Sequence, residues 1–133
     1  MTIGVLLICH QPLGQAMLDI SIETIGVCPL ATEVLDVPLD EDPDLLAAHA
    51  QEMIARLDSG DGVLVLSDLC GATPSNIASR LSRDGRVMVV CGLNLAMLMR
   101  VLNYPNLRLE HLAERAADGG RRGVILMSGG NEG

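Results

Sequence analysis

The sequence has no lysine, no tryptophan and no phenylalanine, and all nine of its basic residues are arginine. Without lysine the chain cannot build a P-loop, which binds phosphate through that side chain, or a Schiff-base enzyme, which needs its amine. A receiver-type phosphoacceptor domain normally uses a lysine too. Seventeen acidic residues give a net charge of −8, and Tyr104 is the single aromatic residue. Nucleic-acid binding wants a basic face and aromatic platforms, so we expect no nucleic-acid partner.

Cysteines are few and scattered along the chain. The four residues show neither a CxxC spacing nor a grouping with histidine of the kind that binds zinc; they are Cys9, Cys28, Cys70 and Cys91. Three of them close apolar runs, where cysteine behaves as a small buried hydrophobe. We therefore expect reduced, mostly structural thiols, and we predict neither a metal nor a cofactor.

Long hydrophobic runs are also missing. The first apolar run, residues 3–8, is far shorter than a signal sequence or a membrane span, and no basic residue precedes it. We expect a cytoplasmic protein. A length of 133 residues suits one domain over residues 1–133, with a core of aliphatic side chains. The polar, glycine-rich end, residues 127–133, is expected to be a flexible tail.

Short apolar runs alternate with segments of helical periodicity. Strands are predicted at residues 3–8, 32–37, 63–67 and 87–91, with a short fifth strand at 124–127. Asp42–Pro43 and Thr73–Pro74 are typical helix starts, and the last helix is expected to begin at Leu109 and to end at Gly119–Gly120. This order predicts an α/β fold with an open, mostly parallel four-stranded sheet, helices on both faces and a fifth C-terminal strand.

Two residues at strand ends suggest chemistry. Ligands of open α/β sheets bind beyond the carboxyl ends of the strands, where His10 follows the first strand and Asp68 follows the third. If these strands are neighbours, the carboxylate can accept a hydrogen bond from one ring nitrogen and leave the other as a nucleophile. From the residues alone, structural and catalytic roles are both open for this pair. His49 and His111 are expected to have surface or packing roles.

The loop after Asp68 adds a place for an anion. It contains Gly71 and leads into a helix that we expect Thr73 to cap, so backbone N–H groups and the helix dipole favour negative charge there. Gly71 is weak support by itself, because strand-to-helix turns use glycine routinely. Together, the histidine, the aspartate and the loop predict a site that carries a phosphoryl group without lysine.

Three stretches of the chain resemble the mannose-family IIA component of the bacterial phosphoenolpyruvate-dependent sugar phosphotransferase system. They are residues 3–14 (IGVLLICHQPLG), 62–76 (GVLVLSDLCGATPSN) and 92–97 (GLNLAM), and the D-L-x-G-x-[ST]-P-x-N pattern in the second is the most specific. The resemblance implies a phosphotransferase in which His10 is phosphorylated, Asp68 orients and stabilises it, and Thr73 contacts the phosphoryl group. It also implies that the loop residues Gly71, Ala72 and Ser75 bind phosphate.

The resemblance further implies the partners. The phosphoryl group would come from the histidine-containing phosphocarrier protein (HPr) and pass to a IIB component during sugar uptake. The chain would then meet a membrane only indirectly, through a transporter complex. Members of the family are homodimers that exchange their last strand, which corresponds here to residues 124–127. Two departures concern the pocket: Ala72 replaces a usual glycine and would be strained at positive φ, and Ala96 replaces a frequent proline.

Three other functions remain open. The same fold could serve as a regulatory module that reports its phosphorylation state to a protein partner. It could also be the phosphodonor subunit of a dihydroxyacetone kinase. A cysteine phosphatase is the weakest alternative, because Cys9 has no arginine a few residues later to complete a phosphate loop.

Overall fold

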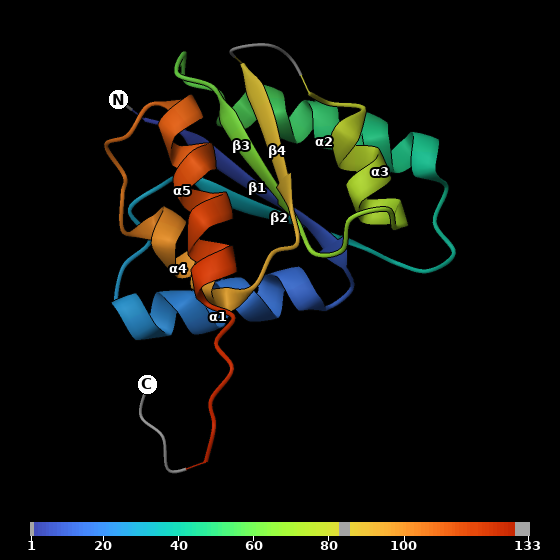
Figure 1. The fold of residues 1–133 in the computed structure, drawn as a ribbon. Coiled ribbons are helices and arrows are strands. Elements are labelled where there is room, and N and C mark those ends of the chain that lie inside the picture. Colours follow the sequence, from blue (N-terminus) through green and yellow to red (C-terminus); the bar gives the residue numbers. More distant parts are fainter. Residues whose placement is uncertain (1, 83–85, 130–133) are drawn as a thin grey trace.

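Four parallel strands form the centre of the protein, and its computed structural model describes residues 2–82 and 86–129. The strands are β1 (Gly4–His10), β2 (Thr32–Val37), β3 (Val63–Ser67) and β4 (Val87–Cys91), and they lie in the order β2-β1-β3-β4. All their carboxyl ends therefore meet at one edge of the sheet (Figure 1). The predicted open parallel α/β sheet is confirmed, and β1 extends two residues further than expected, so that His10 is its last residue.

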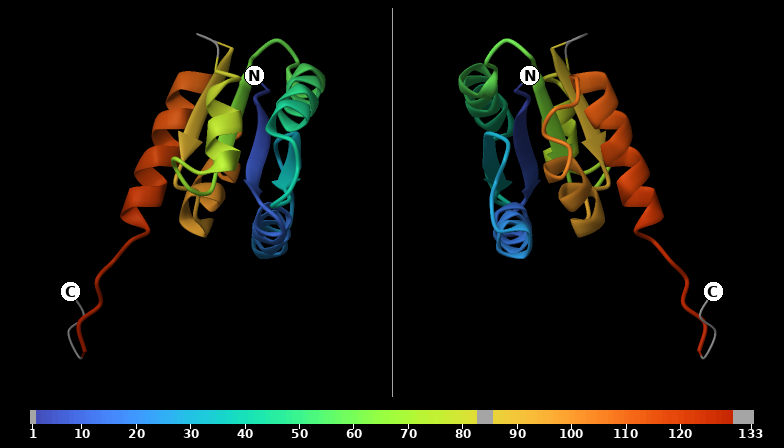
Figure 2. Two further views of the ribbon diagram at one scale, coloured as in Figure 1. Left: turned by 90° about the vertical axis from the view of Figure 1, so that its right-hand side faces the viewer. Right: turned by 90° about the vertical axis from the view of Figure 1, so that its left-hand side faces the viewer.

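Five helices cover the two faces of this sheet. They are α1 (Leu13–Ile25), α2 (Pro43–Leu57), α3 (Thr73–Ser79), α4 (Leu95–Leu102) and α5 (Leu109–Arg122). One core cluster joins α1, α4 and α5 to the sheet, and a second joins α2 and α3 to its other face (Figure 2). Because β1 and β3 are covered on both sides, their residues form continuous apolar runs without polar alternation.

The helix starts differ in how well local sequence predicts them. Asp42 caps α2 as expected: its Oδ1 accepts a hydrogen bond from the Asp44 N–H at 2.9 Å, and Pro43 occupies the first turn. At α3 the cap position belongs to Ala72, and Thr73 is the first helical residue with no side-chain cap hydrogen bond. The expected Thr73 cap is therefore wrong, because the turn that starts this helix is held by Ser75 from inside the helix.

The glycines near the end of α5 do not end the helix, contrary to the prediction. The helix runs on to Arg122, with Gly119 and Gly120 buried against α4. A Cβ on Gly119 would lie 2.7 Å from the Arg100 Cβ, and one on Gly120 would lie 2.8 Å from the Met97 Cε. These glycines therefore serve close helix–helix packing, which local sequence does not reveal.

The predicted fifth strand is absent from this chain's sheet. Residues 124–128, which we call the C-terminal segment, form no strand and extend away from the body after α5 (Figure 2). Gly123 alone separates them from the helix, and its backbone is close to helical (φ −76°, ψ −10°), so no turn returns the chain to the sheet. Of the expected flexible tail, residues 127–129 are exposed or in a turn and residues 130–133 lie outside the described part. None of the helices in the described ranges combines the length and hydropathy that a membrane span requires.

Candidate functional site

His10 and Asp68 meet at the carboxyl edge of the sheet. The pairing of β1 with β3 places Ile8 beside Ser67, so the residues that follow these two on their strands lie close together. The His10 Nδ1 lies 2.9 Å from the Asp68 Oδ2, and the His10 backbone N–H donates to the same oxygen at 2.9 Å. The other carboxylate oxygen accepts the Leu69 N–H at 2.9 Å. The structure thus brings together the two residues that the strand order predicted.

Asp68 and His10 differ in how far their side chains are exposed to solvent. The Asp68 side chain is only 6% exposed, whereas the His10 side chain is 40% exposed. Burial alone would raise the pKa of Asp68, but the hydrogen bonds from the His10 backbone and ring outweigh it and hold that pKa below its usual range. An ionised carboxylate only accepts hydrogen bonds, so the proton between the two groups belongs to Nδ1. In the neutral form of the ring, Nε2 then carries the lone pair.

The loop beside this pair is held by its own hydrogen bonds. The Gly71 N–H donates to the Ser75 Oγ at 2.8 Å, and that hydroxyl donates in turn to the Ala72 carbonyl at 2.9 Å. The Ala72 N–H donates to the Leu69 carbonyl at 3.2 Å. The N–H groups predicted to bind phosphate are therefore engaged within the loop in this conformation. Thr73, the other predicted phosphoryl contact, is exposed at the start of α3.

Ala72 fits its position without strain. Its φ is −88°, and the positive φ of the turn falls one residue earlier, on Gly71 at +90°. The turn thus needs a glycine at position 71, where the chain has one, and needs none at position 72. The condition under which Ala72 would be strained, a positive φ, is therefore not met.

Asp36 is a residue near the site that the sequence analysis missed. It lies near the end of β2, and its carboxylate accepts the Gly14 N–H at 2.9 Å and the Gln15 N–H at 3.3 Å. It therefore satisfies the start of α1, where Pro12 provides no side-chain cap. The only signal in the sequence is an acidic residue near the end of an apolar strand, which becomes informative once β2 is known to lie beside β1.

A cavity lies at the other side of the sheet edge, at the end of β4. It has a volume of about 310 Å³ and is lined by residues of β4, α4 and α5, among them Val90, Asn94, Arg121 and Val124. Neither His10 nor Asp68 is in its wall. Asn94 fixes this region, because its Oδ1 caps α4 at the Met97 N–H (2.8 Å) and its Nδ2 donates to the Gly120 carbonyl (3.1 Å).

His49, His111 and Cys9 do not extend the site. His49 and His111 are exposed on α2 and α5. Burial, followed by the charges of Asp68 and Asp36, raises the pKa of the Cys9 thiol to about 12. That thiol is protonated at neutral pH, which removes the nucleophile of the cysteine-phosphatase alternative. In residues 2–82 and 86–129 there is no group of three acidic, histidine or cysteine side chains placed to hold a metal.

Comparisons with known proteins agree on one family. The family described as PTS system fructose IIA component matches residues 4–116. The PTS system mannose-specific EIIAB component of Escherichia coli (strain K12) is 31% identical over 96 residues, which cover 70% of this chain and 30% of that protein. The transcriptional regulatory protein LevR of Bacillus subtilis (strain 168) is 26% identical over 114 residues, or 81% of this chain and 12% of LevR.

The solved structures agree in fold. The mannose/sorbose specific IIA subunit of the phosphotransferase system from Enterococcus faecalis is 23% identical, with a TM-score of 0.85 over 100% of both chains. The chain spans about 30% of the length of the mannose-specific relatives it matches.

Proposed function

The chain belongs to the family of PTS system fructose IIA components, and from this membership we propose that it carries a phosphoryl group on His10 within the phosphoenolpyruvate-dependent sugar phosphotransferase system. HPr is the proposed donor, a IIB component is the proposed acceptor, and the exchange takes place in the cytoplasm. The observation that carries the proposal is the hydrogen bond between the half-exposed His10 ring and the buried, ionised Asp68. A system for sugar uptake is the setting that the names of the relatives suggest.

The transfer follows from the tautomer of His10. Because Nδ1 keeps its proton and donates a hydrogen bond to Asp68, the lone pair of Nε2 attacks the phosphorus carried by the donor's histidine. A new N–P bond forms as the donor's N–P bond breaks, and the donor imidazole leaves with the electron pair. The positive charge that develops on the His10 ring is stabilised by the Asp68 carboxylate. Passage to the acceptor is the same step in reverse.

The loop would place the phosphoryl group. In this proposal the exposed Thr73 hydroxyl contacts the phosphoryl oxygens. Thr73 is the first residue of α3 and follows the loop that begins at Asp68. Gly71, Ala72 and Ser75 hold the turn through their mutual hydrogen bonds and, in the proposal, line the phosphate side of the pocket. Phosphoryl transfer is catalysed mainly by positioning and charge stabilisation, for which a small rigid site suffices.

We also propose that two chains form a homodimer by exchanging the C-terminal segment. Its apolar side chains are largely exposed in one chain: Val124 77%, Ile125 72%, Leu126 96% and Met127 85%. In the described residues β4 pairs only with β3, so its outer edge can accept a further strand. A segment from a second chain would bury these side chains and complete the predicted fifth strand.

A second candidate role is regulation. It is favoured by the similarity to the transcriptional regulatory protein LevR, which extends over 81% of this chain. In that case phosphorylation of His10 would control binding to a protein partner rather than supply a transporter. The two roles are separated by incubating the phosphorylated and the unphosphorylated chain with a IIB component. Transfer of the phosphoryl group from the phosphorylated chain to the IIB component supports the transport role.

The test is a phosphorylation assay with purified components. The chain is incubated with phosphoenolpyruvate, the first enzyme of the system and HPr, and we expect phosphate on the chain that is labile in acid and stable in base. His10→Ala should abolish the label, whereas His49→Ala, which removes an exposed histidine on α2, should retain it. An unlabelled wild-type chain, or a fully labelled His10→Ala chain, contradicts the proposal.

A further inference from the structure

Two cysteines lie at the same corner of the sheet. Cys91 is the last residue of β4, and it pairs in register with Ser67, the last residue of β3. Cys70 comes three residues after Ser67, in the loop that leads to α3. Leu93 ties the end of β4 to β3, because its N–H donates to the Ser67 carbonyl at 2.9 Å. The chain thus passes from Ser67 to Cys70 beside the strand that ends at Cys91.

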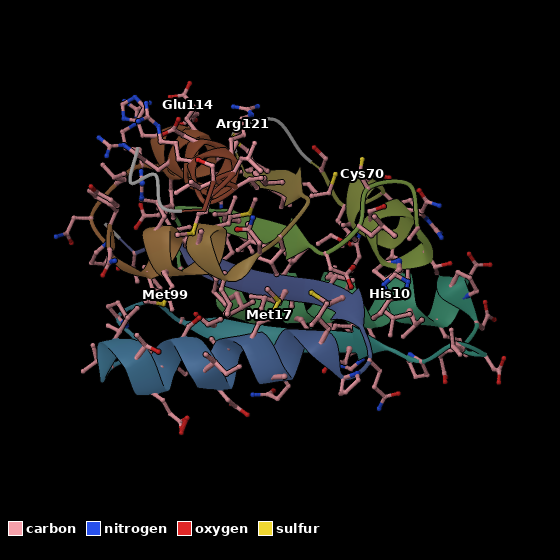
Figure 3. The ribbon with its side chains drawn as sticks, turned by 60° about the horizontal axis from the view of Figure 1, so that its bottom comes forward. His10, Met17, Cys70, Met99, Glu114 and Arg121 are labelled. Carbon is pink, nitrogen blue, oxygen red and sulfur yellow. The ribbon has the colours of Figure 1, made fainter. Side chains whose placement is uncertain are left out.

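Strand alternation places the Cys91 side chain toward that loop. Residues two apart along a strand share a face, so Cys91 points to the same side as Val87 and Val89, which pack with α2 and α3. The loop that carries Cys70 leads directly to α3 on this side. Figure 3 shows Cys70 and His10 at the same end of the molecule, beside α3.

The two thiols interact, and they differ in access. The side-chain hydrogen bond with Cys70, followed by burial and by the charge of Cys70, raises the pKa of the Cys91 thiol. Cys70 is exposed and Cys91 is partly buried, whereas Cys9 is buried at the site. Cys28, also exposed, lies in the connection between α1 and β2. Cys70 is therefore the more accessible thiol of the pair.

A buried hydroxyl adds to this corner. Ser67 is completely buried, and its Oγ has no hydrogen-bond partner in the part of the chain that the structure describes. Because register partners in a parallel pair lie on the same face about 4.8 Å apart, Ser67 and Cys91 are neighbours on one face of the sheet. The corner thus holds two thiols and a buried hydroxyl.

From this arrangement we propose that Cys70 and Cys91 form a reversible disulfide, which makes them a redox modification site next to His10. The oxidant is a small-molecule disulfide. The Cys70 thiolate attacks one of its sulfurs and forms a mixed disulfide as the first small thiolate leaves. The Cys91 thiolate then attacks the Cys70 sulfur, the Cys70–Cys91 bond forms and the second small thiolate leaves. The protein loses two protons and two electrons, and these convert the small disulfide into two thiols.

The bond would restrain the loop that flanks the phosphorylation site. Cys70 is two residues from Asp68 and three from Thr73 in sequence. Joining Cys70 to β4 would add a covalent link to a loop that is otherwise held by its Ser75 hydrogen bonds. This consequence rests on the proposed function. We expect the oxidised chain to accept a phosphoryl group at least about tenfold more slowly, since small misplacements of positioning groups reduce rates strongly.

The arginine-only composition makes the bond easy to locate. Trypsin cuts after arginine, so Cys70 falls in the peptide 57–80 and Cys91 in the peptide 87–100, each with one cysteine. Cys9 and Cys28 share the peptide 1–56. The native chain is treated with oxidised glutathione, its free thiols are alkylated, and the digest is analysed by mass spectrometry without reduction. We expect the peptides 57–80 and 87–100 to be joined, and the whole chain to lose about 2 Da before alkylation.

Matched variants decide the outcome. Cys91→Ser should stop the reaction at a lasting glutathione adduct on Cys70, and Cys28→Ser, which removes the other exposed thiol, should leave the cross-link intact. An unlinked pair of peptides, or a glutathione adduct as lasting in the wild type as in Cys91→Ser, overturns the proposed disulfide. A cross-linked chain that is phosphorylated as fast as the reduced chain overturns its regulatory effect. If the reduced chain is not phosphorylated either, the proposed function fails while the cross-link still supports the redox pair.

Discussion

The His10 site and the C-terminal segment differ in how far one chain satisfies their contacts. At the site, Asp68 accepts three hydrogen bonds and the neighbouring loop is closed by bonds through Ser75. The C-terminal segment has four large apolar side chains that are 72–96% exposed and no strand partner in its own chain. One chain therefore supplies the contacts between His10, Asp68 and the loop, whereas the described part of the chain leaves the apolar side chains of the C-terminal segment uncovered.

This contrast separates two properties, phosphoryl transfer and assembly of the dimer, that are often changed together. Substitutions at the site should alter phosphoryl transfer and leave assembly unchanged, and substitutions in the C-terminal segment should do the reverse. The following predictions test that separation, starting with the largest expected effect.

Asp68→Asn should damage transfer most while leaving the dimer intact. The amide can donate to Nδ1 and so favour the tautomer in which Nε2 carries the proton, which blocks the nucleophile. We expect the initial rate of phosphoryl acceptance from HPr to fall by about 10²–10⁴-fold. Asp36→Asn, at the end of the neighbouring strand β2, is the matched control and should keep most of the rate. An Asp68→Asn chain as fast as the wild type would remove the orienting role from Asp68.

Ile125→Asp should weaken the dimer without altering transfer chemistry. Each of two exchanged segments would lose the burial of one isoleucine, at least about 1.5 kcal/mol per chain or about 3 kcal/mol per dimer. At about 1.4 kcal/mol per factor of ten, the dissociation constant should rise by about 100-fold, as measured by sedimentation velocity over a concentration series. Ser128→Asp adds the same charge just beyond the apolar residues and should have little effect. A wild-type chain that stays monomeric at high concentration would contradict the exchange.

Gly14→Ala should destabilise the fold beside the site. An added Cβ would lie 2.7 Å from the Asp36 Oδ1 and 2.9 Å from the Val34 Cγ1, so α1 would have to move away from β2. We expect the free energy of unfolding in urea to fall by about 1–3 kcal/mol. The exposed neighbour provides the control, since Gln15→Ala should change it by about 0.5 kcal/mol or less. Equal stability of the two variants would show that α1 is not fixed by this close approach.

The smallest effect should appear in the pH dependence of stability. The pKa of Asp68 is lowered in the folded chain, so its contribution is complete above the unfolded-state pKa of about 3.9 and is lost as the pH falls through the lower folded value. Unfolding free energies measured from neutral to acid pH should therefore fall less steeply in Asp68→Asn than in the wild type. A chain from which residues 124–128 alone are deleted, with Glu132 retained, should keep the wild-type slope, because the deleted residues contain no titratable side chain. Identical slopes for Asp68→Asn and wild type would contradict the lowered pKa.

Much of the fold can be predicted from the sequence because its two inner strands are buried on both faces. The predicted bounds of β2, β3 and β4 agree with the structure, and the apolar runs of β1 and β3 are continuous because a doubly covered parallel strand requires apolar residues at consecutive positions. The meeting of His10 and Asp68 follows from the order of the strands alone, because neighbouring parallel strands end at the same edge. Their proposed chemical roles remain predictions.

The features that sequence analysis missed depend on contacts between distant residues. Gly119 and Gly120 resemble a helix end in sequence, but they are needed where α5 packs against α4. Asp36 is identified as a partner of α1 only when β2 is placed beside β1. The strand expected at residues 124–127 has the right composition, yet one chain provides no path back to its own sheet. For the two glycines and for Asp36, the missing information was a contact with residues distant in the sequence.

The most direct test of the central claim is to identify the phosphorylated atom. The chain, labelled with ¹⁵N-histidine, is phosphorylated by phosphoenolpyruvate, the first enzyme and HPr, kept at alkaline pH and examined by NMR. The account predicts a phosphoryl group on the Nε2 of His10, with Nδ1 still protonated toward Asp68. Phosphate on Nδ1, on Thr73 or on any residue other than His10 would contradict it.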